Sequence, residues 1–165
     1  MLAYQLGNEV SYNELATKLG VRRETILRYM YILEEAFIIF RLYPFSRNLR
    51  NEIGRKHKVY FYDLGIRNAI INKLDSAQVR DDIGALWENF CIIERKKQIQ
   101  DNHWYRGLYF WRTTSQKEID YIEDYDGSLY AYEFKWGKKE YKIPKEFMNA
   151  YPGSSATIVN QSNYL

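Results

Sequence analysis

The chain of 165 residues is long enough for one ordinary domain or two small ones, and with 46% hydrophobic residues it can bury a core. Its net charge of +3 is too small to indicate nucleic-acid binding by itself, and its single cysteine, Cys91, excludes an internal disulfide and favours a reducing compartment. The N-terminus lacks a signal-peptide pattern, and the longest fully apolar run, Ala36–Phe40, is far too short to span a bilayer. We therefore expect a soluble, cytoplasmic protein without a membrane segment.

Two helices joined by a tight turn are predicted near the N-terminus. Ser11 and Glu14 match a capping box, in which a serine and an acid three residues later satisfy the first backbone amides of a helix. Gly20 would end this helix, and a second helix would follow over Arg22–Glu35. This second helix starts with arginine rather than serine or threonine, so it should be poorly capped. Helix, glycine turn and helix form the helix-turn-helix pattern.

A two-stranded wing is expected after these helices. The strand-like runs Ala36–Tyr43 and Lys58–Asp63 flank the segment Pro44–His57, in which arginine and lysine far outnumber acids. Residues 1–75 would therefore form a winged helix-turn-helix. Such a domain binds DNA with a helix in the major groove and the wing on the phosphates, unless it serves as a protein-docking module. The candidate nucleic-acid contacts here are Arg22, Arg23, Arg28, Arg47, Arg50, Arg55 and Lys56.

A second domain, residues 80–165, is expected after the polar segment Leu74–Asp81. Residues 82–100 carry apolar side chains at helical spacing, and Glu88 lies beside that apolar stripe. The elements expected after this helix are a strand at 108–113, a two-stranded hairpin, a short helix at about 142–150 and a strand at 156–159.

The hairpin can be assigned a register. Glu118–Asp124 and Leu129–Trp136 alternate with the period of a β-strand, and Asp126-Gly127 between them is a strong hairpin signal. A turn centred on that pair makes Tyr125 face Ser128. Continuing the same register places two acids, Asp120 and Glu133, opposite each other. Two positions further along, the same register would set Glu118 opposite Lys135.

The two faces of this hairpin are predicted to differ. Opposed carboxylates repel unless a positive group lies between them, and Lys135 points to the same face as Glu133. That face would be open enough for a cation and an anionic substrate, whereas the aromatic face should pack on the helix through Trp87 and Phe90. The alternative is a solvated face with a Glu118–Lys135 ion pair. The charged face carries Asp120, Ile122, Ala131, Glu133 and Lys135, and the aromatic face Ile119, Tyr121, Tyr130, Tyr132, Phe134 and Trp136.

Asp120 on one strand, Glu133-Phe134-Lys135 on the next and Glu88 on the preceding helix together resemble the PD-(D/E)xK nuclease motif. Over nearly the whole chain, further segments resemble a more specific group, the C-terminal domain of unknown function on many prokaryotic AAA-type ATPases. The resemblance implies a fold of the α+β or α/β class, a winged helix-turn-helix followed by a restriction-endonuclease-like αβββαβ core. The chain departs from the motif at Ile119, where proline is typical. The segments include Leu15-Ala16, Leu19-Gly20-Val21, Lys58–Gly65, Gly84, Glu88-Asn89-Phe90, Phe110–Thr113 and Glu118-Ile119-Asp120.

The same resemblance implies a chemistry. A divalent ion, Mg²⁺ or Mn²⁺, would be held by Asp120, Glu133 and the Phe134 carbonyl, because hard cations prefer oxygen ligands. It would polarise a phosphate and lower the pKa of a bound water. Lys135 would orient that water, and Glu88 would join as a further ligand or through a water. The residues expected to hold a DNA or RNA backbone are Arg112, Lys138 and Lys139.

The resemblance also implies partners, namely double-stranded DNA or another nucleic acid and an ATPase domain that is missing from this chain. We expect no ATP site here, because Gly137-Lys138-Lys139 does not fit a phosphate-binding loop. The alternative function is a catalytically inactive DNA-binding, protein-interaction or regulatory module of that ATPase.

Overall fold

The computed structural model describes residues 1–46, 56–137 and 141–164. The chain divides into two compact units, residues 1–42 with 56–80 and residues 43–46 with the described residues after 80. It is a mixed α+β protein, whose described residues form α1–α5 and both antiparallel and parallel strand pairs. Within the described ranges, none of the helices has the length and apolar character needed to cross a membrane.

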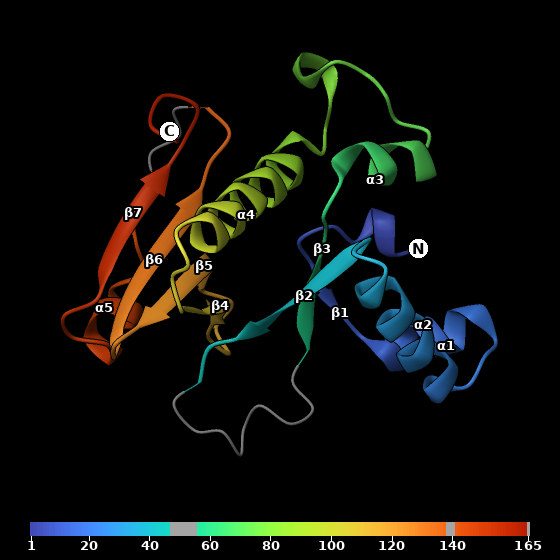
Figure 1. Ribbon diagram of the computed structural model, residues 1–165, viewed down its shortest axis with the longest axis horizontal. Helices are drawn as coiled ribbons and strands as arrows, with labels where there is room; N and C mark the ends of the chain where they lie inside the picture. The colour runs from blue at the N-terminus through green and yellow to red at the C-terminus, as the bar shows by residue number, and fades with distance from the viewer. Residues whose placement is uncertain (47–55, 138–140, 165) are drawn as a thin grey trace. The chain divides into compact units, whose positions relative to one another are not determined.

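The first unit combines helices with a small antiparallel sheet (Figure 1). Strand β3 is central in this sheet, because it pairs with β1 on one edge and with β2 on the other. The two-residue strand β1 was not expected from the sequence. The strands are β1 (Glu9–Val10), β2 (Ile39–Pro44) and β3 (His57–Phe61), and the helices are η1 (Leu2–Tyr4), α1 (Tyr12–Leu19), α2 (Arg23–Glu35), α3 (Leu64–Ile70) and η3 (Ala77–Val79).

The helix ends of this unit follow the capping signals of the sequence. The Glu14 N–H donates to the Ser11 hydroxyl at 3.3 Å, and Gly20 ends α1 in the left-handed region at φ 66°. Arg22 gives α2 no side-chain cap, as predicted. Asp63 starts α3 by accepting backbone N–H groups, including that of Gly65 at 2.6 Å. Local sequence thus places the helix–turn–helix of this unit.

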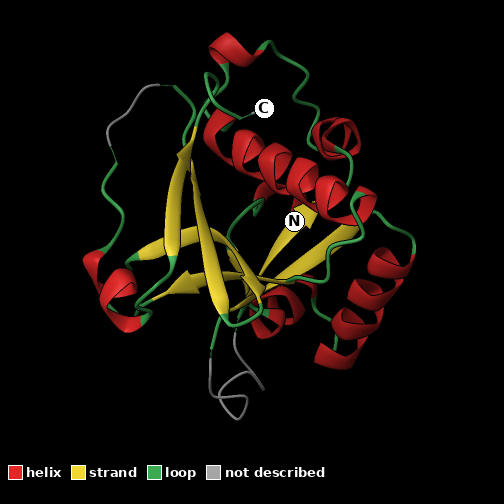
Figure 2. Cartoon of the chain, turned by 60° about the vertical axis from the view of Figure 1, so that its left-hand side comes forward, coloured by secondary structure: helices red, strands yellow, loops and turns green. Residues whose placement is uncertain are grey.

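In the second unit β4, β5, β6 and β7 lie side by side in this order, with β4–β5 and β5–β6 antiparallel and β6–β7 parallel, and the end of β2, Tyr43 and Pro44, pairs in parallel with β4. Helix α4 lies along one face of this sheet, and α5 covers the other through Phe147 (Figure 2). The order of elements is the expected helix, three strands, helix, strand. The bounds are α4 (Ile83–Asp101), β4 (Gly107–Arg112), β5 (Glu118–Tyr125), β6 (Ser128–Phe134), α5 (Lys145–Ala150) and β7 (Ser155–Val159).

The hairpin register is confirmed from Tyr125↔Ser128 to Tyr121↔Tyr132. Its turn residues, Asp126 and Gly127, have φ of 50° and 75°, and two positive φ values are what a type I′ turn requires. The aromatic face also packs as predicted. The rings of Trp136 and Trp87 lie 5.5 Å apart between centroids.

One prediction about the hairpin faces was wrong. Ile119 pairs with Trp111 whereas Ile122 pairs with Tyr109, so β5 carries one extra residue between these pairs. This β-bulge turns Ile119 to the same face as Ile122.

The charged face is also not open along its length, contrary to expectation. Ile122 and Ala131 are fully buried there in a cluster with Phe147 of α5. The helix covers this part of the face, so any site must lie at its far end, toward Asp120 and Glu133.

Candidate functional site

The candidate site lies where the regular ladder between β5 and β6 ends. The last pair of that ladder is Tyr121↔Tyr132. Just beyond it, the Phe134 N–H donates to Oδ2 of Asp120 at 2.9 Å. The carboxylate of Asp120, next to the bulge in β5, thus accepts a hydrogen bond from the backbone of the neighbouring strand β6. This bond fixes Asp120 against the end of β6.

Lys135 brings a positive charge to the two acids. Its Nζ donates to Oε1 of Glu133 and lies 3.9 Å from Oδ2 of Asp120. The structure therefore brings together three of the four residues of the predicted motif. Oε2 of Glu133 is buried and makes no hydrogen bond of regular geometry with the described residues, although the Asp120 backbone and the Tyr141 hydroxyl lie close enough to the Glu133 carboxylate to act on it. A buried carboxylate oxygen without a regular hydrogen bond is costly, so this atom is positioned to accept from something additional.

The charges of these groups are strongly linked. Burial raises the pKa of Glu133, and the neighbouring Lys135 ammonium partly offsets that rise. Burial lowers the pKa of Lys135, but the carboxylates of Asp120, Glu133 and Glu88 outweigh it, and the net effect is a raised pKa. Glu88 on α4 also raises the pKa of Glu133. The fourth residue of the motif is therefore close enough for its charge to act on the other three.

Tyr141 completes the site and was missed in the sequence. Its hydroxyl donates to the Glu118 carbonyl at 3.1 Å, and its ring centroid lies 4.5 Å from Nζ of Lys135. Burial raises the pKa of Tyr141, and the nearby carboxylates of Glu133 and Asp120 raise it further. No motif or periodicity marks this loop residue, so only the folded chain places it here.

The carboxylates of Asp120 and Glu133 lie together at this site, and the Phe134 carbonyl stays a predicted metal ligand. Among the residues that the structure describes, no group of three or more His, Cys, Asp or Glu side chains is arranged to hold a metal ion. Glu88 acts on the site through its charge, and its role as a further ligand stays a prediction. Two carboxylates still suit Mg²⁺, which binds proteins through one or two carboxylates and keeps several waters.

The predicted nucleic-acid contacts fall into three groups. Arg112 is engaged within the second unit, since it contacts Gln116 and lies 3.4 Å from a carboxylate oxygen of Glu118. The predicted contacts of the first unit that the structure describes are all exposed, namely Arg22, Arg23, Arg28 and Lys56. Those outside the described residues are Arg47, Arg50, Arg55, Lys138 and Lys139.

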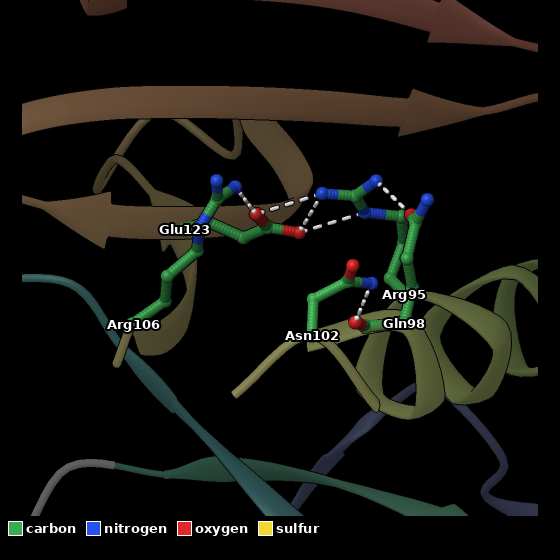
Figure 3. Close-up of polar contacts among 5 residues, drawn as sticks. All are labelled: Arg95, Gln98, Asn102, Arg106 and Glu123. Carbon is green, nitrogen blue, oxygen red and sulfur yellow. Dashed lines mark hydrogen bonds and ion pairs between the residues drawn. The ribbon is translucent and has the colours of Figure 1, made fainter. Parts of the chain in front are cut away.

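A buried ion cluster in the second unit was not predicted at all. Glu123 on β5 is completely buried, and its carboxylate accepts from Nε and Nη2 of Arg95 on α4, both at 2.8 Å. Arg106 contacts the same carboxylate from the opposite side (Figure 3). The sequence shows Glu123 only as one acid in an alternating strand, so its partners 28 and 17 residues away could not be inferred.

Two domain families match the chain, one over each half. Residues 1–77 match a domain of unknown function, DUF8612, and residues 83–164 match another domain of unknown function, DUF4143. Uncharacterized proteins of Mycobacterium bovis and Mycobacterium tuberculosis are each 30% identical to this chain over 137 residues, 82% of this chain and 30% of the relative. An uncharacterized protein of Methanocaldococcus jannaschii is 28% identical over 91 residues, 54% of this chain and 19% of the relative.

The chain therefore spans about 30% of the length of the mycobacterial relatives. No solved structure matches it.

Proposed function

We propose that the second unit is a metal-dependent nuclease-like module, which acts on phosphodiester bonds of nucleic acid at Asp120, Glu133 and Lys135. The observation that carries this proposal is Oε2 of Glu133, a buried oxygen without a regular hydrogen bond beside a second carboxylate. A buried carboxylate oxygen beside a second carboxylate fits a hard cation, and Mg²⁺ or Mn²⁺ suits this donor set.

The donor set would hold the ion through one oxygen of each acid. Asp120 is oriented by the Phe134 N–H, which donates to its Oδ2. Glu133 offers Oε2, while its Oε1 stays on Lys135. The bound ion would supply Lewis-acid activation of a phosphate and a water of lowered pKa.

The residues of the chain would do the remaining work. The Lys135 ammonium would offset the charge that develops on the phosphate, because its raised pKa keeps it protonated at neutral pH. Glu88 would add negative charge near the acids and so favour a bound cation. The buried positions of Asp120 and Glu133 would strengthen these interactions by excluding bulk water.

The test compares the wild type with Asp120→Asn, which keeps an acceptor for Phe134 N–H but loses the charge, and with Asp124→Asn as a matched control on the same strand. A ligand that binds only the folded state adds about 2.7 kcal/mol when its concentration is 100 times Kd. Thermal melts with Mn²⁺ should show that gain for the wild type and Asp124→Asn but not for Asp120→Asn. Equal gains in all three would refute the site.

Cleavage is measured beside the melts, on single- and double-stranded DNA and RNA. Lys135→Met should abolish cleavage and leave Mn²⁺ binding in place. A wild type that gains stability from Mn²⁺ but cleaves no substrate would instead identify the alternative function, an inactive nucleic-acid-binding or regulatory module. That an ATPase accompanies such a module stays a prediction.

We also propose that the first unit binds duplex DNA as a winged helix. What supports this is the exposed arginines Arg22, Arg23 and Arg28 at and along α2, which follows α1 after a glycine turn. Replacing all three by alanine should weaken binding and lower the salt slope by about 0.9 for each lost phosphate contact. Lys97→Ala, in the second unit, is the control. An unchanged affinity and slope would favour protein docking instead.

A further inference from the structure

We propose that Tyr141 is a positioning residue, whose ring holds the Lys135 ammonium over the two carboxylates of the site. This inference rests on the proposed function for its catalytic meaning, but its geometry does not depend on a metal or a substrate. It assigns a role to a residue outside the Asp120, Glu133, Lys135 and Glu88 motif.

The backbone of Lys135 is fixed, but it does not determine the position of the ammonium at the end of the side chain. It follows directly on the last residue of β6, and its N–H still bonds the Val159 carbonyl on β7 at 2.9 Å. Beyond that bond, four rotatable bonds separate its backbone from Nζ, and a lysine side chain carries large rotamer entropy. Something else must therefore select one position for the ammonium.

Three groups surround Nζ of Lys135. Glu133 Oε1 accepts from it, Asp120 Oδ2 lies at 3.9 Å, and the ring centroid of Tyr141 lies at 4.5 Å. A cation within about 6 Å of a ring centroid is attracted by the negative face of the ring. The ion pair with Glu133 holds the ammonium near the acids, and the ring adds a contact from the loop that limits its movement further.

Tyr141 itself is anchored to the strand that bears Asp120. Its hydroxyl donates to the backbone carbonyl of Glu118, two residues before Asp120. The ring is therefore tied to β5, while the lysine that it contacts leaves the end of β6. The loop before α5 thus couples the two strands of the site.

The contact between Tyr141 and Lys135 argues against Lys135 being an ordinary solvated surface lysine. Nζ makes its contacts with groups of the site, and Tyr141 shields it from solvent on the side of the ring. The Lys135 side chain is therefore partly enclosed, with an exposed fraction of 28%. The ring makes the position of Lys135 reproducible, which general electrostatic catalysis requires.

The experiment measures the side-chain proton shifts of lysine by NMR, because an aromatic ring shields protons above its face. The Lys135 ε-methylene signal, identified by its disappearance in Lys135→Met, should lie upfield of the signals of solvated lysines in the metal-free wild type. Tyr141→Phe keeps the ring and should keep the upfield shift. Tyr141→Leu should lose it, whereas Tyr105→Leu, at a highly exposed tyrosine, should leave it unchanged.

The cleavage assay then separates positioning from folding. Tyr141→Leu should lower kcat roughly 2- to 30-fold, the range that corresponds to one cation–π contact, with little change in KM. Tyr141→Phe should restore most of the rate. A uniform loss in both variants would mean a structural role and overturn the proposal.

The two proposals fail in different ways. An unshifted Lys135 signal in the wild type, or one that persists in Tyr141→Leu, overturns the positioning role even if the protein cleaves DNA. A shifted signal that depends on the Tyr141 ring, in a protein that neither binds Mn²⁺ nor cleaves, overturns the proposed function alone. If Tyr141→Leu does not fold, the wild type still decides, because an unshifted Lys135 signal there overturns the positioning role.

Discussion

Replacing Glu123 by glutamine should destabilise the second unit by about 3 kcal/mol. The wild-type carboxylate is fully buried and accepts from two guanidinium groups, Arg95 and Arg106. Glutamine keeps the shape but loses the charge and offers a donor where an acceptor is needed. Two cations would then lie beside a neutral amide.

The magnitude follows from how deeply each partner is buried. Removing one member of a buried ion pair costs about 3–5 kcal/mol, because the remaining charge is left without compensation. The side chains of Arg95 and Arg106 keep 22% and 15% of their exposure, so water can solvate part of each. Their aromatic contacts also remain, Arg106 over Trp104 at 4.2 Å and Arg95 over Tyr132 at 4.8 Å. The cost should therefore lie at the low end of that range.

The assay is urea unfolding at neutral pH, followed by tryptophan fluorescence. All four tryptophans of the chain, Trp87, Trp104, Trp111 and Trp136, belong to the second unit, so the signal reports that unit alone. Arg106→Met should cost less than Glu123→Gln, because the bidentate pair with Arg95 still balances the acid. The double variant should cost less than the sum of the two single variants.

Two outcomes would refute this reasoning. A Glu123→Gln protein within about 0.5 kcal/mol of the wild type would show that the cluster contributes no more than an exposed pair. Additive single and double variants would show that Glu123 and Arg106 do not act on each other. Asp124→Asn, at the next residue of β5 but only half-buried, is the control and should stay near the wild type.

Two further predictions concern other parts of the chain. Burial, and then the charge of Arg41, lowers the pKa of His57 to about 4, so the first unit should lose stability as pH falls from about 6.5 to about 4, by about 3 kcal/mol in all. An NMR titration of His57 with a midpoint near 6.5 would contradict this. Phe134→Ala should cost the second unit about 3–5 kcal/mol, because Phe134 is buried and its ring lies beside those of Tyr121 and Tyr132, and a loss below about 1 kcal/mol in the fluorescence assay would contradict that packing.

Local signals in the sequence predicted most of the elements. Ser11 caps α1 and Gly20 ends it, because both act within a few residues. Asp126-Gly127 fixed the hairpin register for the same reason, since its two positive φ values select one turn type. The alternation of Leu129–Trp136 then predicted which side chains face α4. In each case the information lies within one element or one turn.

Contacts between distant segments could not be predicted in this way. The bulge that turns Ile119 depends on how β5 pairs with β4, and no residue of β5 predicts it from the sequence. The contact of Arg41 with Glu34 and Tyr12 joins β2 to both α1 and α2. Lys58 begins a predicted strand with no sign of burial in the sequence, yet it is buried in the middle of its sheet. Such positions are set by which elements meet, not by local propensity.

The candidate site depends both on local signals and on contacts between distant segments. For this reason the sequence predicted some of its residues and not others. Asp120, Glu133 and Lys135 belong to one hairpin, so its register alone brings them near one another. The bulge changes how Asp120 is held, but it does not separate Asp120 from Glu133, because the β5–β6 ladder stays regular up to Tyr121↔Tyr132. Tyr141 reaches the same place from a loop, through one hydrogen bond and one ring contact. A residue that acts through such contacts carries no periodic signal, and the residues that support a site are therefore harder to predict than those that form it.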